Sequence, residues 1–198
     1  MDTFFIYIQL GLDHILDIQG YDHILFIISL TILYSIRDWK SLLILVTAFT
    51  IGHSTTLAFT VLDLINFNSD KVEFLIMLSI SITAFMNIIR GGKTPNGIGM
   101  KIYYSVALLF GFIHGMGFAS YLKAILGNHG NLLSPLLGFN IGLEVGQLII
   151  VSILLLLTYI LNILFKINKQ SFVVIISAII FGVTIPILFE RDLFVLFN

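Results

Sequence analysis

Six ionisable side chains stand in stretches of this sequence that are otherwise strongly apolar: His14, Asp22, His23, His53, His114 and Glu144. An ionisable group within hydrocarbon is costly unless it is paired, protonated or bound to a metal, so each marks a candidate site. Imidazole together with carboxylate suits Ni²⁺, Zn²⁺, Co²⁺ or Cu²⁺. The absence of cysteine and the scarcity of methionine argue against Cu⁺. The residue types therefore predict a divalent transition-metal site with nitrogen and oxygen ligands.

The first of these side chains belong to a twin motif. Two copies of Asp-His-Ile-Leu lie nine residues apart in the stretch GLDHILDIQGYDHILF, on either side of Gly20. Glycine permits a sharp reversal and Asp22 is a natural N-cap for a following helix. We expect a hairpin that brings His14 and His23 together at or just below the outer membrane surface.

Three later segments each add one polar position. His53 lies in FTIGHSTTLAF and His114 in GFIHGMGFA, where Gly111 and Gly115 have the spacing of close helix contacts. In LLGFNIGLEVGQL, a row of glycines at every fourth residue predicts a packing face, and Glu144 falls on the opposite, polar face. Ser54, Asn140 and Gln147 are expected to orient the ligands as hydrogen-bonding partners.

Other interpretations apply to each residue taken alone. His14 and His23 could face water, His53 and His114 could make interhelical hydrogen bonds, and Glu144 could be protonated. Asp22 could serve only as a helix cap. We expect Asp13 and Asp17 to be solvated surface acids, and His129 to lie in an exposed loop. A shared site is favoured because the six positions converge on one side and depth of the expected bundle.

The elements that must position these residues are transmembrane helices. Of the 198 residues, 58% are hydrophobic and 11% are charged, with a mean hydropathy of +1.06, which is typical of a membrane protein. We expect one all-α transmembrane domain, a polytopic helical bundle over residues 1–198. A net charge of −1 without a basic patch argues against a nucleic-acid partner. The sequence has no Walker motif, so we expect no bound nucleotide. The N-terminus lacks the basic region and cleavage site of a removable signal peptide.

Hydrophobic runs predict about seven segments: 4–18, 22–36, 40–62, 72–89, 102–126, 133–165 and 171–189. The first two are short for a span, so one of them could be tilted, re-entrant or packed inside the bundle. Lysine and arginine collect seven to three on alternate sides, and the positive-inside rule then predicts that both termini lie outside the cytoplasm.

Five blocks, GLDHILDIQGYDHILF, FTIGHSTTLAF, VEFLIMLSI, GFIHGMGFA and FNIGLEVGQL, resemble in order and spacing the HupE/UreJ family of small integral membrane proteins. The resemblance spans Gly11 to Leu148 and implies a nickel or cobalt permease. By this resemblance, the family's first motif corresponds to His14, Asp22 and His23, and its later polar positions correspond to His53, His114 and Glu144. The hydrogenase-linked branch tends to have His-Pro in the first motif, whereas Ile15 follows His14 here, so the chain is closer to the second branch.

The sequence thus predicts an uptake permease in a bacterial inner membrane. Its partners are the bilayer and a divalent metal ion, most readily nickel, with cobalt or zinc also open. Transport requires binding that is weak enough to release the ion. The alternative is an intramembrane zinc-dependent hydrolase acting on a lipid or peptide at the outer leaflet, with Glu144 or Asp22 as general base. A scaffold with a structural metal is a third hypothesis, and homo-oligomerisation stays open.

Overall fold

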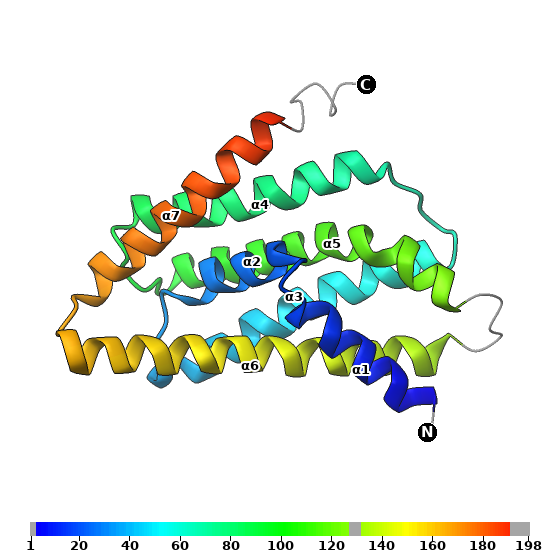
Figure 1. Ribbon diagram of the computed structural model, residues 1–198, viewed down its shortest axis with the longest axis horizontal. Coiled ribbons are helices and arrows are strands. Elements are labelled where there is room, and N and C mark those ends of the chain that lie inside the picture. The colour runs from blue at the N-terminus through cyan, green and yellow to red at the C-terminus, as the bar shows by residue number, and fades with distance from the viewer. Residues whose placement is uncertain (1–2, 127–131, 191–198) are drawn as a thin grey trace.

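The computed structural model describes residues 3–126 and 132–190, which form an all-helical bundle (Figure 1). Its elements are α1 (Thr3–Leu16), α2 (Tyr21–Thr31), the short 3₁₀ helix η1 (Ile36–Asp38), α3 (Trp39–Val61), α4 (Ser69–Ile89), α5 (Ile98–Leu126), α6 (Leu133–Phe165) and α7 (Lys169–Glu190). The five helices from α3 to α7 are long and apolar enough to cross a membrane. The prediction of seven helical segments, the first two short, is confirmed.

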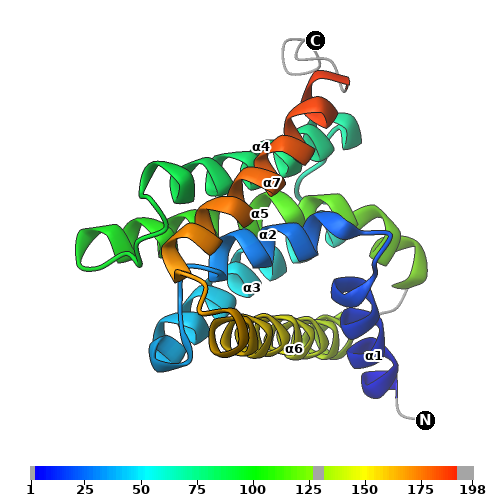
Figure 2. The same cartoon turned by 60° about the vertical axis from the view of Figure 1, so that its left-hand side comes forward.

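The two short helices together make one crossing that is broken in its middle (Figures 1 and 2). α1 runs parallel to the first half of α6: Phe4 packs at Gly138, and Ile15 packs at Gly146, near the midpoint of α6. α2 then continues toward the other end, where the Asn87 side-chain amide, near the end of α4, donates to the Ser29 carbonyl at 2.6 Å. The break at residues 17–20 therefore lies halfway through the bundle.

The expected hairpin at the outer surface is wrong, because α1 and α2 follow one another head to tail. Asp22 does not cap α2: Gly20 occupies the N-cap position without a side-chain bond, and Asp22 lies in the first helical turn. That both termini lie outside the cytoplasm stays a prediction from the count of lysine and arginine.

Glycines bring the helix backbones together where the histidines are held. A Cβ atom at Gly142 would overlap the Ile8 carbonyl oxygen of α1, and one at Gly111 would overlap the Phe49 carbonyl oxygen of α3. These contacts bear out the predicted packing faces of α5 and α6, because only glycine allows so close an approach. The α1–α6 contact thereby fixes the depth of His14, and the α3–α5 contact fixes that of His53 and His114.

Charged residues divide between the two ends of the bundle. The basic end, which holds η1 and the α4–α5 and α6–α7 connections, has one described acid, Asp38, beside seven basic residues: Arg37, Lys40, Arg90, Lys93, Lys101, Lys166 and Lys169. Toward the other, acidic end lie Asp13, Asp17, Asp22, Asp63, Asp70, Glu73 and Glu190, with Lys71 and Lys123 as the described basic residues. This division gives the bundle a direction along the membrane normal.

Candidate metal centre

Four imidazoles from four helices meet beside the break between α1 and α2. The ring centroids of His14 and His23 are 4.6 Å apart, and that of His53 lies 6.0 Å from His14 and 6.3 Å from His23. The His114 ring lies 5.2 Å from His23. His53 is eight residues from the end of α3, which places the cluster about 12 Å along the helix from that end. The sequence predicted this convergence, and the structure gives it by packing four separate elements.

The first possible ligand group consists of His14, His23 and His53. One nitrogen from each ring can be chosen so that the three atoms lie within 4.8 Å of one another. Ligand nitrogens around a tetrahedral ion at ~2.1 Å are separated by about 3.4 Å, so small rotations of the rings would close the group on a metal. His53 is completely buried behind the other two rings.

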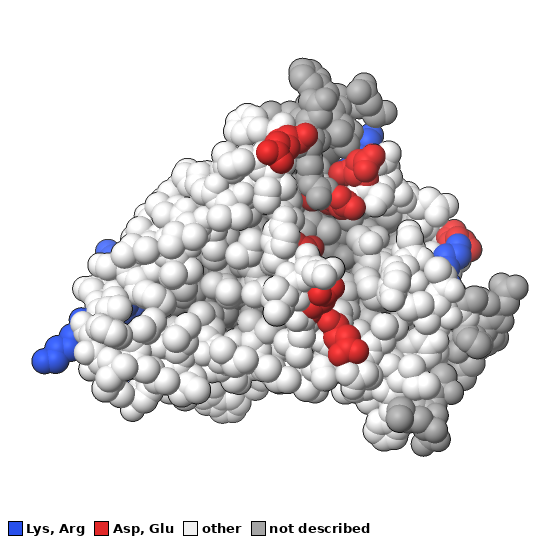
Figure 3. Space-filling view, in the orientation of Figure 1, with Lys and Arg blue, Asp and Glu red and all other residues white. Residues whose placement is uncertain are grey.

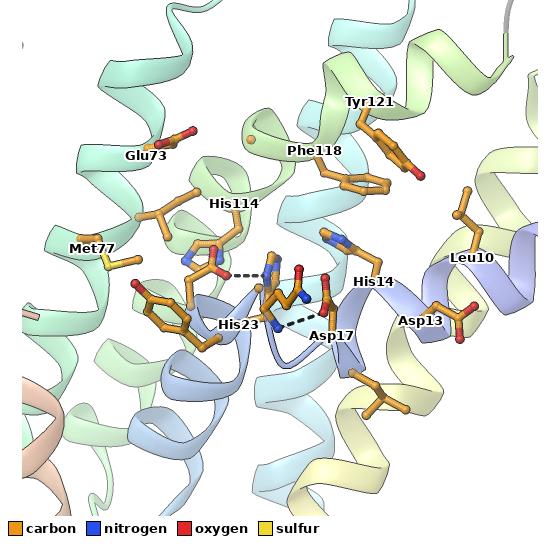
Figure 4. Close-up of a pocket in the computed structure, with 17 residues that line it drawn as sticks. Leu10, Asp13, His14, Asp17, His23, Glu73, Met77, His114, Phe118 and Tyr121 are labelled. Atoms are coloured by element: carbon orange, nitrogen blue, oxygen red, sulfur yellow. Dashed lines mark hydrogen bonds and ion pairs between the residues drawn. The ribbon is translucent and has the colours of Figure 1, made fainter. Parts of the chain in front are cut away.

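The second group consists of Asp22, His23 and His114, whose ligand atoms also lie within 4.8 Å of one another. The His23 Nδ1 atom is 3.3 Å from Oδ1 of Asp22, the contact drawn as a dashed line in Figure 4. Ser79 Oγ on α4 lies 3.2 Å from Nε2 of His114, which orients that ring and leaves Nδ1 toward the cluster. His23 belongs to both groups, so they form two overlapping sites with one common ligand.

The nitrogens of these rings are buried without hydrogen-bond partners. This applies to Nε2 of His14, both nitrogens of His23 and of His53, and Nδ1 of His114. The Asp22 contact with His23 is close enough for an ion pair but lacks hydrogen-bond geometry. Buried polar groups in native proteins are nearly always satisfied, and a group of unsatisfied nitrogens is typical of a site that takes an ion or water.

Aromatic rings pack against the histidines. Phe139 stacks on His53 with centroids 6.2 Å apart, and Phe118 lies 3.8 Å from the His14 ring. Phe26 and Phe49 lie 5.0 and 5.2 Å from His114. This wall fixes the ring orientations and lowers the local dielectric, which strengthens any bond between an imidazole and a cation.

A cavity of about 840 Å³ reaches the cluster (Figure 4). Its lining includes His14, His23 and His114 but not His53, so the described site has an open side and a closed side. Asp13, Asp17 and Glu73 also line it. The cavity connects the two ligand groups to the exterior, as an exchangeable ion requires.

Glu144, expected as a ligand, belongs to neither group. It is half-buried on α6 and accepts a hydrogen bond of 2.7 Å from Thr47 on α3. Gln147 accepts one of 2.9 Å from Thr50. Because Thr47 and Thr50 precede His53 by six and three residues, the two pairs lie about 9 Å and about 4.5 Å from His53 along α3, toward the basic end.

The expected orienting residues behave differently from one another. Gln147 bonds Thr50, and Ser54 donates to the Thr50 carbonyl of its own helix at 2.6 Å. Asn140 has a buried Oδ1 without a hydrogen-bond partner. Ser79, which does contact an imidazole, is not among the residues predicted to orient the ligands, because a serine within an apolar helix does not indicate which side chain it will meet.

The comparisons with known proteins agree with the resemblance found in the sequence. A family model described as HupE / UreJ protein matches residues 1–191, which is nearly the whole chain. Neither the curated proteins nor the solved structures gave a match. The helices that could span a membrane and this family match together establish an integral membrane protein, and the chain belongs to the HupE/UreJ family.

Proposed function

We propose that this protein takes up a divalent transition metal ion, nickel in the first place, through the site at the α1–α2 break. The observation that carries the proposal is the group of buried, unpartnered imidazoles contributed by four different helices. Three or four such groups, with one carboxylate, are what a divalent ion of this class needs in place of its water shell.

The broken crossing supports transport in particular. In many membrane transporters the substrate site lies near the bilayer midplane, where a discontinuous helix exposes its ends to the ion. Here α1 ends and α2 begins at the level of the cluster, and His14 and Asp22 lie in the adjoining helical turns. A structural metal site needs no such break, because rigid helices hold ligands equally well.

The preference for nickel in this proposal is supported by the family as well as by ligand chemistry. Nitrogen ligands with a carboxylate accept nickel, cobalt and zinc, with affinities that follow the general order for these ions. Membership of the HupE/UreJ family favours nickel or cobalt over zinc. The metal is cargo in this proposal, so it must be able to leave.

The path runs from the acidic end of the bundle toward the basic end. The positive-inside rule assigns the basic end to the cytoplasm, in keeping with a bacterial inner membrane. An ion held by Asp22, His23 and His114, which all line the cavity, can pass to His14 and His53 while His23 stays bound. Glu144 with Thr47, placed beyond His53, offers the next oxygen ligands on the way inward.

Uptake of ⁶³Ni²⁺ into proteoliposomes tests the proposal, with protein of both orientations distinguished by protease accessibility. The wild type should accumulate the ion, and the variant with His14, His23 and His53 all changed to alanine should match empty liposomes. The proposal fails if the wild type binds no stoichiometric nickel, cobalt or zinc after loading.

The same preparation tests the hydrolase hypothesis. Tight metal that resists exchange, no uptake, and release of product from lipid or peptide substrates would replace transport by metal-dependent hydrolysis, with Asp22 beside the metal as general base. Stoichiometric exchangeable metal with uptake and no hydrolysis would exclude it.

A further inference from the structure

We propose that the cavity in front of the histidine cluster is a cation-collecting vestibule, in which Asp13, Asp17 and Glu73 attract a hydrated divalent ion before the histidines bind it. This inference rests on the proposed function, because it assigns the first step of ion capture to residues outside both ligand groups. It also gives a role to two aspartates that the sequence indicated only as solvated surface acids.

The three carboxylates come from three parts of the chain and share one cavity. Asp13 lies on α1, Asp17 lies in the break, and Glu73 lies on α4, and all three line the same cavity (Figure 4). Asp22 lines it as well, and no lysine or arginine occurs among its described lining residues. The charged side chains among the described lining residues are therefore all acidic, and they come from several elements.

The residues at the inner end of the cavity indicate which kind of ligand the acidic wall attracts. His23 is 5% exposed and His114 is fully buried, and both line the cavity with ring nitrogens that have no hydrogen-bond partner. An acidic wall alone would be a solvated surface. An acidic wall that leads to unpartnered imidazoles points to a cation as the ligand of the whole cavity.

Two of the carboxylates are held in place by local hydrogen bonds. The Gln9 side-chain amide donates to Oδ1 of Asp13 at 2.8 Å, and the Gln19 backbone N–H donates to Oδ1 of Asp17 at 2.9 Å. Both acids are exposed, so the ion they attract keeps its water shell. Their task is long-range attraction and not coordination.

Two described lysines, Lys71 and Lys123, lie toward this end of the bundle, and neither lines the cavity. Lys123 forms an ion pair with Asp63. Figure 3 shows acidic side chains across the middle of this face, with basic side chains toward its edges. A cleft lined by one sign of charge focuses the field, and such focusing raises association rates by roughly 10- to 1,000-fold at low salt.

The association rate of Ni²⁺ tests the vestibule. Protein in nanodiscs of neutral phosphatidylcholine is mixed with Ni²⁺ in a stopped-flow instrument, with a fluorescent chelator reporting free metal. The test variant carries Asp13→Asn, Asp17→Asn and Glu73→Gln, which keep side-chain size and remove charge. The control variant carries Asp70→Asn, which removes an exposed acid near the start of α4 that does not line the cavity.

At low salt, where the Debye length is about 30 Å, the triple variant should bind Ni²⁺ at least ~10-fold more slowly than the wild type. At about 1 M salt, where the Debye length is ~3 Å, the two rates should converge. The dissociation rate and the bound nickel per chain should be unchanged, because both ligand groups are intact. The control should follow the wild type at both salt concentrations.

Equal rates and equal salt dependence in the triple variant and the wild type would overturn the vestibule while leaving metal binding in place. A slowdown of the same size in the control would also overturn it, because the effect would then belong to overall charge. If the wild type binds no metal at all, the proposed function fails and the vestibule fails with it. Circular dichroism and thermal unfolding of each variant show whether the fold is retained.

Discussion

Replacing His23 should abolish metal binding, whereas replacing His14 or His114 should leave most of it. His23 is the one residue common to both ligand groups, while His14 and His114 each belong to only one. His23→Ala reduces both groups to two ligands. His14→Ala leaves Asp22, His23 and His114 complete, and His114→Ala leaves the group that contains His53 complete.

The size of the effect follows from how the groups share one ion. If the ion alternates between two groups of equal affinity, loss of one group halves the association constant, a change of about 0.4 kcal/mol. If all five side chains held one ion together, loss of any ligand should cost at least what loss of an outer-shell partner costs, roughly 10- to 100-fold or ~1.4–2.7 kcal/mol. The two arrangements therefore differ by a readily measured factor.

Isothermal titration of nanodisc protein with Ni²⁺ measures these constants for the three single variants and for the double variant His14→Ala/His114→Ala. Only the double variant should lose binding as His23→Ala does, which makes the two single changes strongly non-additive. Thr55→Ala, two residues from His53 and bonded to its own helix through the Ile51 carbonyl, is the matched polar control. Binding by His23→Ala within about threefold of the wild type would refute the shared-ligand reasoning, as would a hundredfold loss in His14→Ala.

Three further predictions concern the framework and the inward path. Gly142→Ala should destabilise the protein by about 1–3 kcal/mol and weaken metal binding, because the added methyl group would push α1 away from α6. Gly182→Ala is the control and should be tolerated, because Gly182 has no neighbour within 4 Å. Thermal unfolding of both variants, with and without nickel, measures the difference. Asn87→Ala should lower the free energy of unfolding by roughly 1–3 kcal/mol, because Asn87 donates a hydrogen bond to Ser29 and accepts one from Tyr103. Asn87→Asp should restore little of this stability, because it lacks the amide donor. Unfolding in detergent measures both variants. Glu144→Gln should keep nickel affinity within about threefold and slow uptake, because Thr47 can still donate to the amide oxygen while the charge is lost; a loss of equilibrium binding would return Glu144 to the ligand set.

The sequence predicts the helices well because each is a long apolar run bounded by charged or turn residues. α6 is observed with its predicted bounds, 133–165, and the other segments differ by a few residues at their ends. The glycine row of α6 also predicts its packing face, since close backbone approach is possible only there. Such features depend on local sequence, which is why they can be read without a structure.

The broken crossing could not be predicted in this way. A short apolar segment next to another short apolar segment fits both a hairpin and two half-spans, and Gly20 fits either. The choice depends on what each half packs against: α1 against the glycines of α6, and α2 against α4. These contacts join residues more than 50 positions apart, which no local pattern reports.

The neighbours of Glu144 in the fold also could not be predicted from the sequence. On sequence, an acid in the middle of an apolar helix at the depth of the histidines looks like a ligand. In the fold, α3 crosses α6 so that Thr47 meets Glu144, while His53, six residues later on α3, faces α1 and α2. Sequence gives only an approximate depth, and the face that a helix turns to each neighbour depends on the crossing angle.

The two copies of Asp-His-Ile-Leu contribute different residues to the candidate ligand groups, because they lie on opposite sides of the break. In the first copy, at the end of α1, the histidine joins a ligand group while Asp13 lines the cavity. In the second, at the start of α2, both Asp22 and His23 join a ligand group. Helix ends favour this division: the carbonyl end of α1 attracts a cation beside His14, and the amide end of α2 stabilises the carboxylate of Asp22. A continuous helix would offer neither partial charge at this depth, so the break belongs to the proposed cation site.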